Sequence, residues 1–473
     1  MLGYATRINV PLAQCCAPFP LPRLTVLRLL IASWLLITLL AATPILAITS
    51  GSFAQHVISL ATALMMAMAT RGPEAQIASA AQLLKQFLLI FLLPVVWMTL
   101  QIFPMSSLAN PIWSATSIAL NQPSLQGRIS VDTGATLQSL FLYLVNVSLL
   151  VSTVIITRDR RMAETILFVL SAVTTLMSVE FLLGRLDLFA GIIPQSGAAK
   201  NLFPAAAALA ILTNGALVAR ALERHLHQQN IHNLASPQLW VGVFCGLSGI
   251  AVAFAALAAL EQHTLVAVTG CGLMVLVFIA AVRRLGFRFW PSALLFLVLA
   301  AIASAMVVPH SLSGSLGLAG FVSLPPEAVA PARHLLSDAP TWGNGLGTFR
   351  LTSRAYQEFG AALADPPSTA VLMAVEAGRL PSAILAAFAA QFFLVSFRGA
   401  VRRGRDSFFA ATAAAGVVVV LCESFLDSSL SNPTIQAIVA MMVGVGLAQS
   451  VGRTSGANHS AASAHRNTSF ILN

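Results

Sequence analysis

Long apolar segments alternate with short polar ones along most of the chain. A helix needs roughly 20 mainly apolar residues to cross the hydrocarbon core of a bilayer. Twelve segments approach this length: 27–48, 53–70, 86–103, 135–157, 162–183, 201–221, 239–260, 264–282, 290–309, 369–397, 407–427 and 433–451. The second is the weakest, and Pro381 in the tenth predicts a bend or a short tilted helix at its start. The pattern predicts an all-α polytopic membrane protein with about 12 transmembrane helices.

Composition agrees with this class. Hydrophobic residues make up 57% of the chain and charged residues 9%, with a mean hydropathy of +0.84. Soluble domains carry about 25% charged residues. None of the five cysteines has zinc-type or CxxC spacing, so we expect neither a metal site nor a disulfide.

The distribution of basic residues predicts the orientation. The formal net charge of +10 could indicate nucleic-acid binding, but the basic clusters are short and lie beside the ends of apolar segments. Cytoplasmic loops are enriched in Lys and Arg. With the N-terminus inside, all but seven of the 26 basic residues fall on the cytoplasmic side. The seven outer ones are Arg128, Arg185, Lys200, Arg333, Arg350, Arg354 and Arg379. We therefore expect both termini in the cytoplasm and no nucleic-acid partner.

The resulting layout has five parts. Residues 1–26 form a cytoplasmic N-terminus, 27–309 carry helices 1–9, 310–368 form a large outer loop, 369–451 carry helices 10–12, and 452–473 form a polar, disordered cytoplasmic tail. The first apolar segment ends near "TPILA", which a cleaved signal peptide would also explain, but its length and the parity of the segments favour a retained helix. The outer loop is too long for a simple connector, so we expect it to carry function.

Within that loop, "TWGNGLGTFRLTSR" (341–354) is polar, glycine-rich and doubly basic. A helix can start after Thr348, a plausible N-cap, and it would place Arg350 and Arg354 one turn apart. Two such guanidinium groups repel each other by about 0.2–0.5 kcal/mol, a cost that a bound anion would reverse. Free N–H groups at a glycine-rich helix start, together with arginine, suit phosphate oxygens. The segment thus indicates a diphosphate site, although Arg354 could instead pair with Glu358 and leave Arg350 solvated.

Five segments together resemble a known family. They are "DAPTWGNGLGTF" (338–349), "NPIWSATSIALNQPSLQGRISVD" (110–132), "SGAAKNLFPAAAALA" (196–210), "VEAGRLP" (375–381) and "ESFLDSSL" (423–430). In this order, with a large outer loop after the ninth helix, they are similar to motifs of the bacterial O-antigen ligase and O-antigen/exopolysaccharide polymerase superfamily.

The resemblance implies a metal-independent glycosyltransferase of the C-type membrane architecture, without a cofactor, in the bacterial inner membrane. It would transfer a glycan from undecaprenyl diphosphate, on the periplasmic face, to a sugar hydroxyl. The acceptor would be lipid A-core for a ligase or another lipid-linked glycan for a polymerase. Segment 110–132 resembles the exopolysaccharide-type members and therefore favours a polymerase. The expected partners also include the lipid bilayer and other proteins of polysaccharide assembly.

The resemblance also implies site residues. The expected diphosphate ligands are Arg350, Arg354, Lys200, Arg185, Gly345 and Gly347, and the candidate bases are Asp365, Glu376 and His263. Alternatives exist for three of the outer charges: Arg185 could pair with Asp187, Arg128 with Asp132, and Glu376 could cap a helix or pair with Arg379.

Two departures from the family pattern affect the base. Pro367 and Ser368 stand where many members have His-Asn. The sequence "EQHTLVAVTG" (261–270) stands where many have Ser-Arg-Gly, with His263 as a partial replacement. A catalytically impaired relative is therefore one alternative. A transporter or flippase of lipid-linked substrate is another, but such proteins often show internal repeats with matching broken helices, and this chain shows none.

Overall fold

The structure is a computed structural model. It describes residues 22–49, 51–122, 126–185, 202–229, 237–260, 263–285, 334–354, 366–402 and 406–450. The predicted ninth segment, 290–309, most of the outer loop, residues 1–21 of the predicted N-terminal part and the predicted tail 452–473 lie outside these residues.

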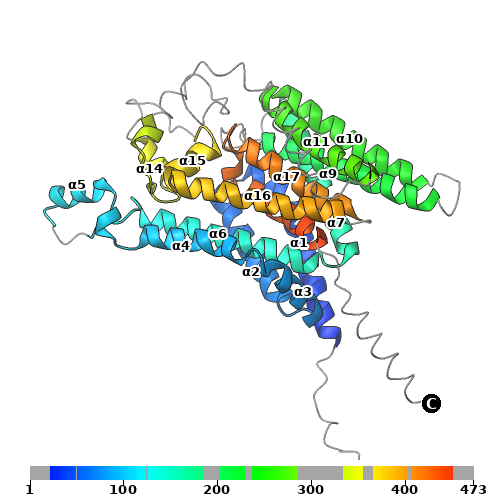
Figure 1. The fold of residues 1–473 in the computed structure, drawn as a ribbon, viewed down its shortest axis with the longest axis horizontal. Coiled ribbons are helices and arrows are strands. Elements are labelled where there is room, and N and C mark those ends of the chain that lie inside the picture. Colours follow the sequence, from blue (N-terminus) through cyan, green and yellow to red (C-terminus); the bar gives the residue numbers. More distant parts are fainter. Residues whose placement is uncertain are drawn as a thin grey trace, which may run out of the picture.

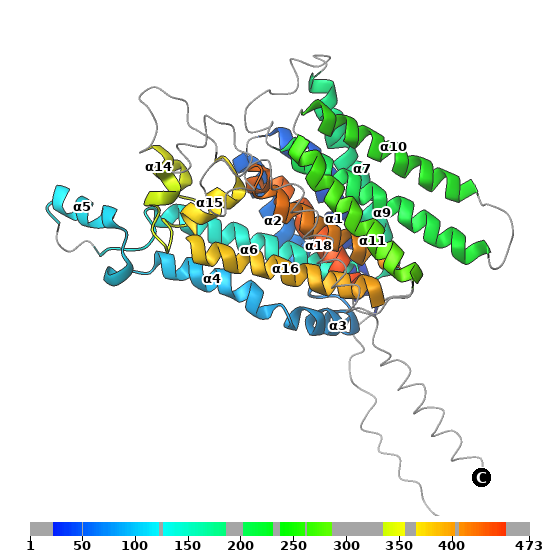
Figure 2. The same ribbon diagram turned by 45° about the horizontal axis from the view of Figure 1, so that its top comes forward.

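The described residues form helices packed side by side, with the last two in the middle of the molecule (Figures 1 and 2). They are α1 Pro22–Ile48, α2 Gly51–Ala69, α3 Glu74–Lys85, α4 Leu88–Ile102, α5 Pro111–Ala119, α6 Thr133–Ile156, α7 Arg160–Arg185, α9 Phe203–Gln229, α10 Pro237–Ala259, α11 His263–Leu285, α14 Phe349–Arg354, α15 Thr369–Glu376, α16 Arg379–Arg402, α17 Ser407–Glu423 and α18 Pro433–Ser450, with 3-10 turns at Ser106–Leu108 and Ser429–Ser431. Within the same residues the extended pairing is a single bridge between Pro104 and Arg128.

The predicted segments agree closely with the observed helices. Nine of the described helices are long and apolar enough to cross a membrane, and each overlaps a predicted segment. The third predicted segment corresponds to α3 and α4, which are bent by 67° at a short break, and the eleventh to the shorter apolar helix α17. The fold is therefore that of a multi-pass helical membrane protein.

The tenth predicted segment is two helices. A short helix, α15, does begin it, but the break lies at Gly378, which has φ +97°, and not at Pro381. Pro381 lies in the first turn of α16, where its missing N–H has no intrahelical partner to lose. The helix that is long and apolar enough to cross a membrane is thus Arg379–Arg402, and α15 is separate from it.

Helices α17 and α18 form the packed centre. Both are rich in Ala, Gly and other small residues, which let helix backbones approach closely within a membrane. A Cβ at Gly446 of α18 would lie only 2.0 Å from the Cβ of Ala413 in α17. In α18, 83% of the apolar window is buried, against 17% in the peripheral helix α16.

The helix ends gather on two opposite sides of the bundle. At one, which we call the basic end, the Arg158 guanidinium donates to the carbonyls of Ser79 and Ala448, and Gln449 donates to the carbonyl of Thr157. At the other, which we call the glycine end, segment 341–349 meets the start of α6 and the α15–α16 break. Because α6 and α16 each run from one end to the other, the two ends face opposite sides of the membrane.

A polar contact joins α7 and α9 inside the bundle. The side chain of Asn214 accepts a hydrogen bond from Ser171 at 2.8 Å and donates to the hydroxyl of Thr175 at 2.7 Å. It also donates to the carbonyl of Ala210 in its own helix. This amide is 3% exposed, so its polar atoms depend on these partners.

We expect Asn214→Ala to destabilise the protein by about 1 kcal/mol, because hydrogen bonds between membrane helices contribute roughly 0.6 kcal/mol each. The thermal unfolding midpoint in detergent should fall by a few degrees. Leu222→Ala, at an exposed position of the same helix, is the control and should have little effect. Equal midpoints for the two variants would contradict this role of Asn214.

Candidate functional site at the glycine end

The glycine-rich segment approaches the neighbouring backbone too closely for side chains. Gly345 has φ +101° and Gly347 has φ +81°, conformations that L residues with side chains rarely adopt. A Cβ at Gly345 would lie 2.4 Å from the hydroxyl oxygen of Ser130, and one at Gly347 would lie 2.6 Å from that of Ser139. The glycines therefore let the segment fit against the start of α6.

The N–H groups of this segment already have acceptors within the protein. Those of Gly347 and Phe349 donate to the Glu376 carboxylate, the latter at 2.8 Å, and that of Gly345 donates to the Glu376 carbonyl at 3.0 Å. The Leu346 N–H donates to the side-chain oxygen of Gln101 at 3.3 Å. An external diphosphate would therefore have to be held by side chains and not by the amides of Gly345 and Gly347.

Glu376 acts as a cap for α14. Its carboxylate accepts from the N–H at the helix start, where the sequence predicted Thr348 as the N-cap. The Thr348 hydroxyl instead donates to the Gly345 carbonyl at 2.6 Å. Arg379, the alternative partner of Glu376, donates to the carbonyl of Leu336. Glu376 is 4% exposed, and this burial raises its pKa to about 7, although the N–H groups of Gly347 and Phe349 oppose the shift.

Two residues of α4 that the motifs did not include fix the same backbone. Gln101 is fully buried and donates to the carbonyls of Trp342 and Glu376, at 3.4 and 3.2 Å. The indole N–H of Trp97 donates to the carbonyl of Ala377 at 3.0 Å. A glutamine inside an otherwise apolar helix was the one sequence signal for this contact, since a buried amide requires partners.

Segment 104–132 also bonds to the glycine-rich segment. The Asn110 side chain donates to that of Asn344 at 2.8 Å, and the Val131 N–H donates to the Asn344 carbonyl at 2.9 Å. Asp132 caps α6 by accepting from the N–H groups of Gly134 and Ala135, and among the ion pairs of the described residues it is not joined to Arg128, its alternative partner. Three segments distant in the sequence, 104–132, 341–349 and 375–378, thus form one hydrogen-bonded unit.

The candidate cations follow directly after this unit. Arg350 and Arg354 lie exposed on α14, and neither has an acidic partner among the described residues. Arg185 lies at the end of α7, where it donates to the carbonyl of Ala259 at 2.7 Å. The other expected site and partner residues, Lys200, Asp365, Asp187 and Glu358, lie outside the described residues, as does the side chain of His263.

The described residues define a helical multi-pass membrane protein with a hydrogen-bonded polar unit at one end. Comparison of the chain with models of protein families and with curated protein sequences gives no match.

We expect Gly345→Ala to lower the thermal unfolding midpoint by several degrees, because the added Cβ would meet Ser130 and strain the backbone. Gly270→Ala is the control: a Cβ there meets nothing within 4 Å, and alanine favours the helix by about 0.5–1 kcal/mol. If Gly345→Ala unfolded no earlier than this control, the close fit of the glycine-rich segment would be wrong.

The raised pKa of Glu376 predicts a pH dependence of stability. The folded protein holds this proton more tightly than the unfolded chain, so protonation of Glu376 stabilises the fold. This stabilisation is complete below pH 4.5 and is lost as the pH rises through about 7. The unfolding midpoint should therefore fall between pH 5 and pH 8. Glu376→Gln keeps an acceptor but cannot ionise, so it should flatten this change; an unaltered pH profile in this variant would contradict the assignment.

Proposed function

We propose that the protein is a membrane glycosyltransferase that transfers a glycan from undecaprenyl diphosphate to a sugar hydroxyl, as a polysaccharide polymerase or an O-antigen ligase. The supporting observation is the pair Arg350 and Arg354, exposed on a short helix whose start is fixed by the buried Glu376. The sequence resemblance described above supplies the reaction class.

The geometry suits this chemistry. The reaction breaks the bond between the anomeric carbon and the diphosphate oxygen, so negative charge develops on the leaving diphosphate. Guanidinium groups held in place before the reaction stabilise such charge without reorganisation. Arginine can also bind two phosphate oxygens at once. The backbone unit beneath α14 would hold both side chains at the membrane boundary.

The orientation of the chain supports a reaction on the outer face. Arginines are concentrated at the basic end, where Arg158, Arg160, Arg220, Arg224 and Arg283 lie, and the positive-inside rule assigns that end to the cytoplasm. The glycine end would then face the periplasm, where the glycan-bearing lipid is expected.

The acceptor hydroxyl needs a base within hydrogen-bond reach. Glu376 is committed to the N–H groups of Gly347 and Phe349 and is almost fully buried, so we assign it a positioning role. Ser368, which stands where many members of the resembled family have Asn, caps α15 by accepting from the Val371 N–H at 3.2 Å. Asp365 and His263 remain the candidate bases.

Replacing Arg350 or Arg354 by alanine should reduce glycan transfer by roughly tenfold or more, since donors to developing charge contribute at least this much. The measurement is the transfer rate of the purified protein with a lipid-diphosphate-linked glycan. Arg161→Ala, at an exposed arginine of the basic end, is the matched control and should transfer at the normal rate. Full activity in both α14 variants would remove the diphosphate role.

Deleting the gene in its own host tests the class of function. Loss of long surface glycans, with single repeat units left on the core, would indicate a polymerase, and complete loss of core-attached glycan a ligase. Unchanged glycans together with defective solute uptake would favour a transporter and contradict the proposal.

A further inference from the structure

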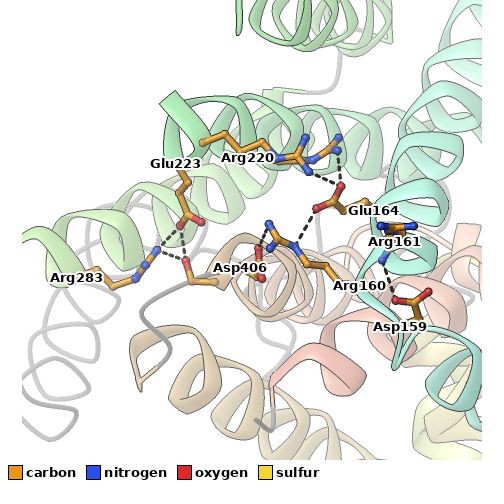
Figure 3. Close-up of polar contacts among 10 residues, drawn as sticks. Asp159, Arg160, Arg161, Glu164, Arg220, Glu223, Arg283 and Asp406 are labelled. Carbon is orange, nitrogen blue, oxygen red and sulfur yellow. Dashed lines mark hydrogen bonds and ion pairs between the residues drawn. The ribbon is translucent and has the colours of Figure 1, made fainter. Parts of the chain in front are cut away.

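A cluster of charged side chains at the basic end joins α7, α9 and the start of α17. The Glu164 carboxylate contacts three guanidinium groups, those of Arg160 at 3.1 Å, Arg220 at 2.7 Å and Arg224. Arg160 also pairs with Asp406 at 2.8 Å, as Figure 3 shows. Three guanidinium groups thus share two carboxylates, which leaves one positive charge without a counter-charge within this network.

A cavity of about 150 Å³ lies beside the cluster, between α7, α9 and α10. Arg220, Arg224 and His225 contribute charged and N–H donor groups to its lining. Phe168, Leu239 and Val241 are among its apolar lining residues. The cavity is therefore amphipathic: cationic and N–H donor groups lie next to an aliphatic and aromatic wall.

The cavity lies at the ends of two candidate membrane spans, Phe203–His225 and Leu239–Ala259, which is where the membrane–water boundary is expected. Apart from Phe168 of α7, its lining residues lie toward the end of α9, which carries Arg220, Glu223 and Arg224, and in the first turns of α10. Trp240, next to the lining residue Val241, is 66% exposed, and tryptophan side chains are enriched at this level of the bilayer. Phe168 and Val241 are 54% and 63% exposed, so the apolar wall continues into the surface that would contact lipid.

We propose that this cavity binds an anionic phospholipid of the leaflet at the basic end. Arg220 and Arg224 hold the headgroup phosphate while continuing to contact Glu164, and an acyl chain follows the apolar wall past Val241. The bound phosphate supplies the negative charge that the arginine network lacks. Basic pockets between transmembrane helices have the chemistry that anionic lipid headgroups require.

A lipid suits the cavity better than free phosphate does. Inorganic phosphate would neutralise the arginines equally well, but it would leave the apolar wall without a contact. Only a phosphate ester with an attached hydrocarbon chain uses both parts. The site lies at the opposite end of the bundle from Arg350 and Arg354, so it does not depend on the proposed transfer reaction.

Native mass spectrometry of the detergent-purified protein with phosphatidylglycerol or phosphatidylcholine of identical acyl chains provides the test. We expect phosphatidylglycerol to bind with a clear preference and Arg224→Gln to weaken it about fivefold, the effect of one basic residue near an anionic headgroup. Val241→Trp, which should obstruct the apolar wall, should weaken the binding of phosphatidylglycerol as well. Arg161→Gln, an exposed arginine at the same end but outside the cavity lining, should bind it as the unmodified protein does.

Several results would overturn the proposal. These are equal binding of the two lipids by the unmodified protein, equal weakening by Arg161→Gln and Arg224→Gln, or displacement of phosphatidylglycerol by millimolar inorganic phosphate. A monodisperse gel-filtration peak and an unchanged helical circular dichroism spectrum will establish that each variant is folded. Should Arg224→Gln fail this criterion, Val241→Trp decides, and normal phosphatidylglycerol binding by that variant would also refute the site.

Discussion

The Glu376 carboxylate, bonded to the N–H groups of Gly347 and Phe349, is the contact on which the glycine end depends. A buried carboxylate is costly unless hydrogen-bond donors satisfy it. The first N–H groups of a helix have no intrahelical partners. Here those N–H groups donate to the buried carboxylate, so both groups are satisfied by the same contact. Because Glu376 ends α15 directly before the Gly378 break, the same contact fixes the beginning of α14 relative to the membrane-spanning helix α16.

The positions of the helices could be predicted from the sequence because bilayer thickness imposes a length on every apolar segment. That constraint located all the described transmembrane helices, including the bent pair α3–α4. It could not locate the break in the tenth segment. Pro381 was the obvious signal, but proline is tolerated in a first turn, whereas Gly378 lies where the backbone of Thr341 approaches too closely for any side chain.

The candidate site was predictable in outline and not in its contacts. The spacing of Arg350 and Arg354 predicted two cations on one helix, and both are exposed on α14. What failed was the expectation that the glycine amides are free for an external anion. Both amides donate to Glu376, which lies on a separate segment after the outer loop, so the local glycine pattern could not reveal their acceptor.

Comparing the two ends of the bundle shows why the exposed arginines carry the functional argument. At the basic end, guanidinium groups are drawn together by Glu164, Glu223 and Asp406, so most of their charge is balanced inside the protein. At the glycine end, the Glu376 and Asp132 carboxylates accept hydrogen bonds from backbone N–H groups. Arg350 and Arg354 are therefore left facing outward without an acid from the described part of the chain. Their repulsion is a cost to folding, and a doubly charged phosphate ligand would relieve it.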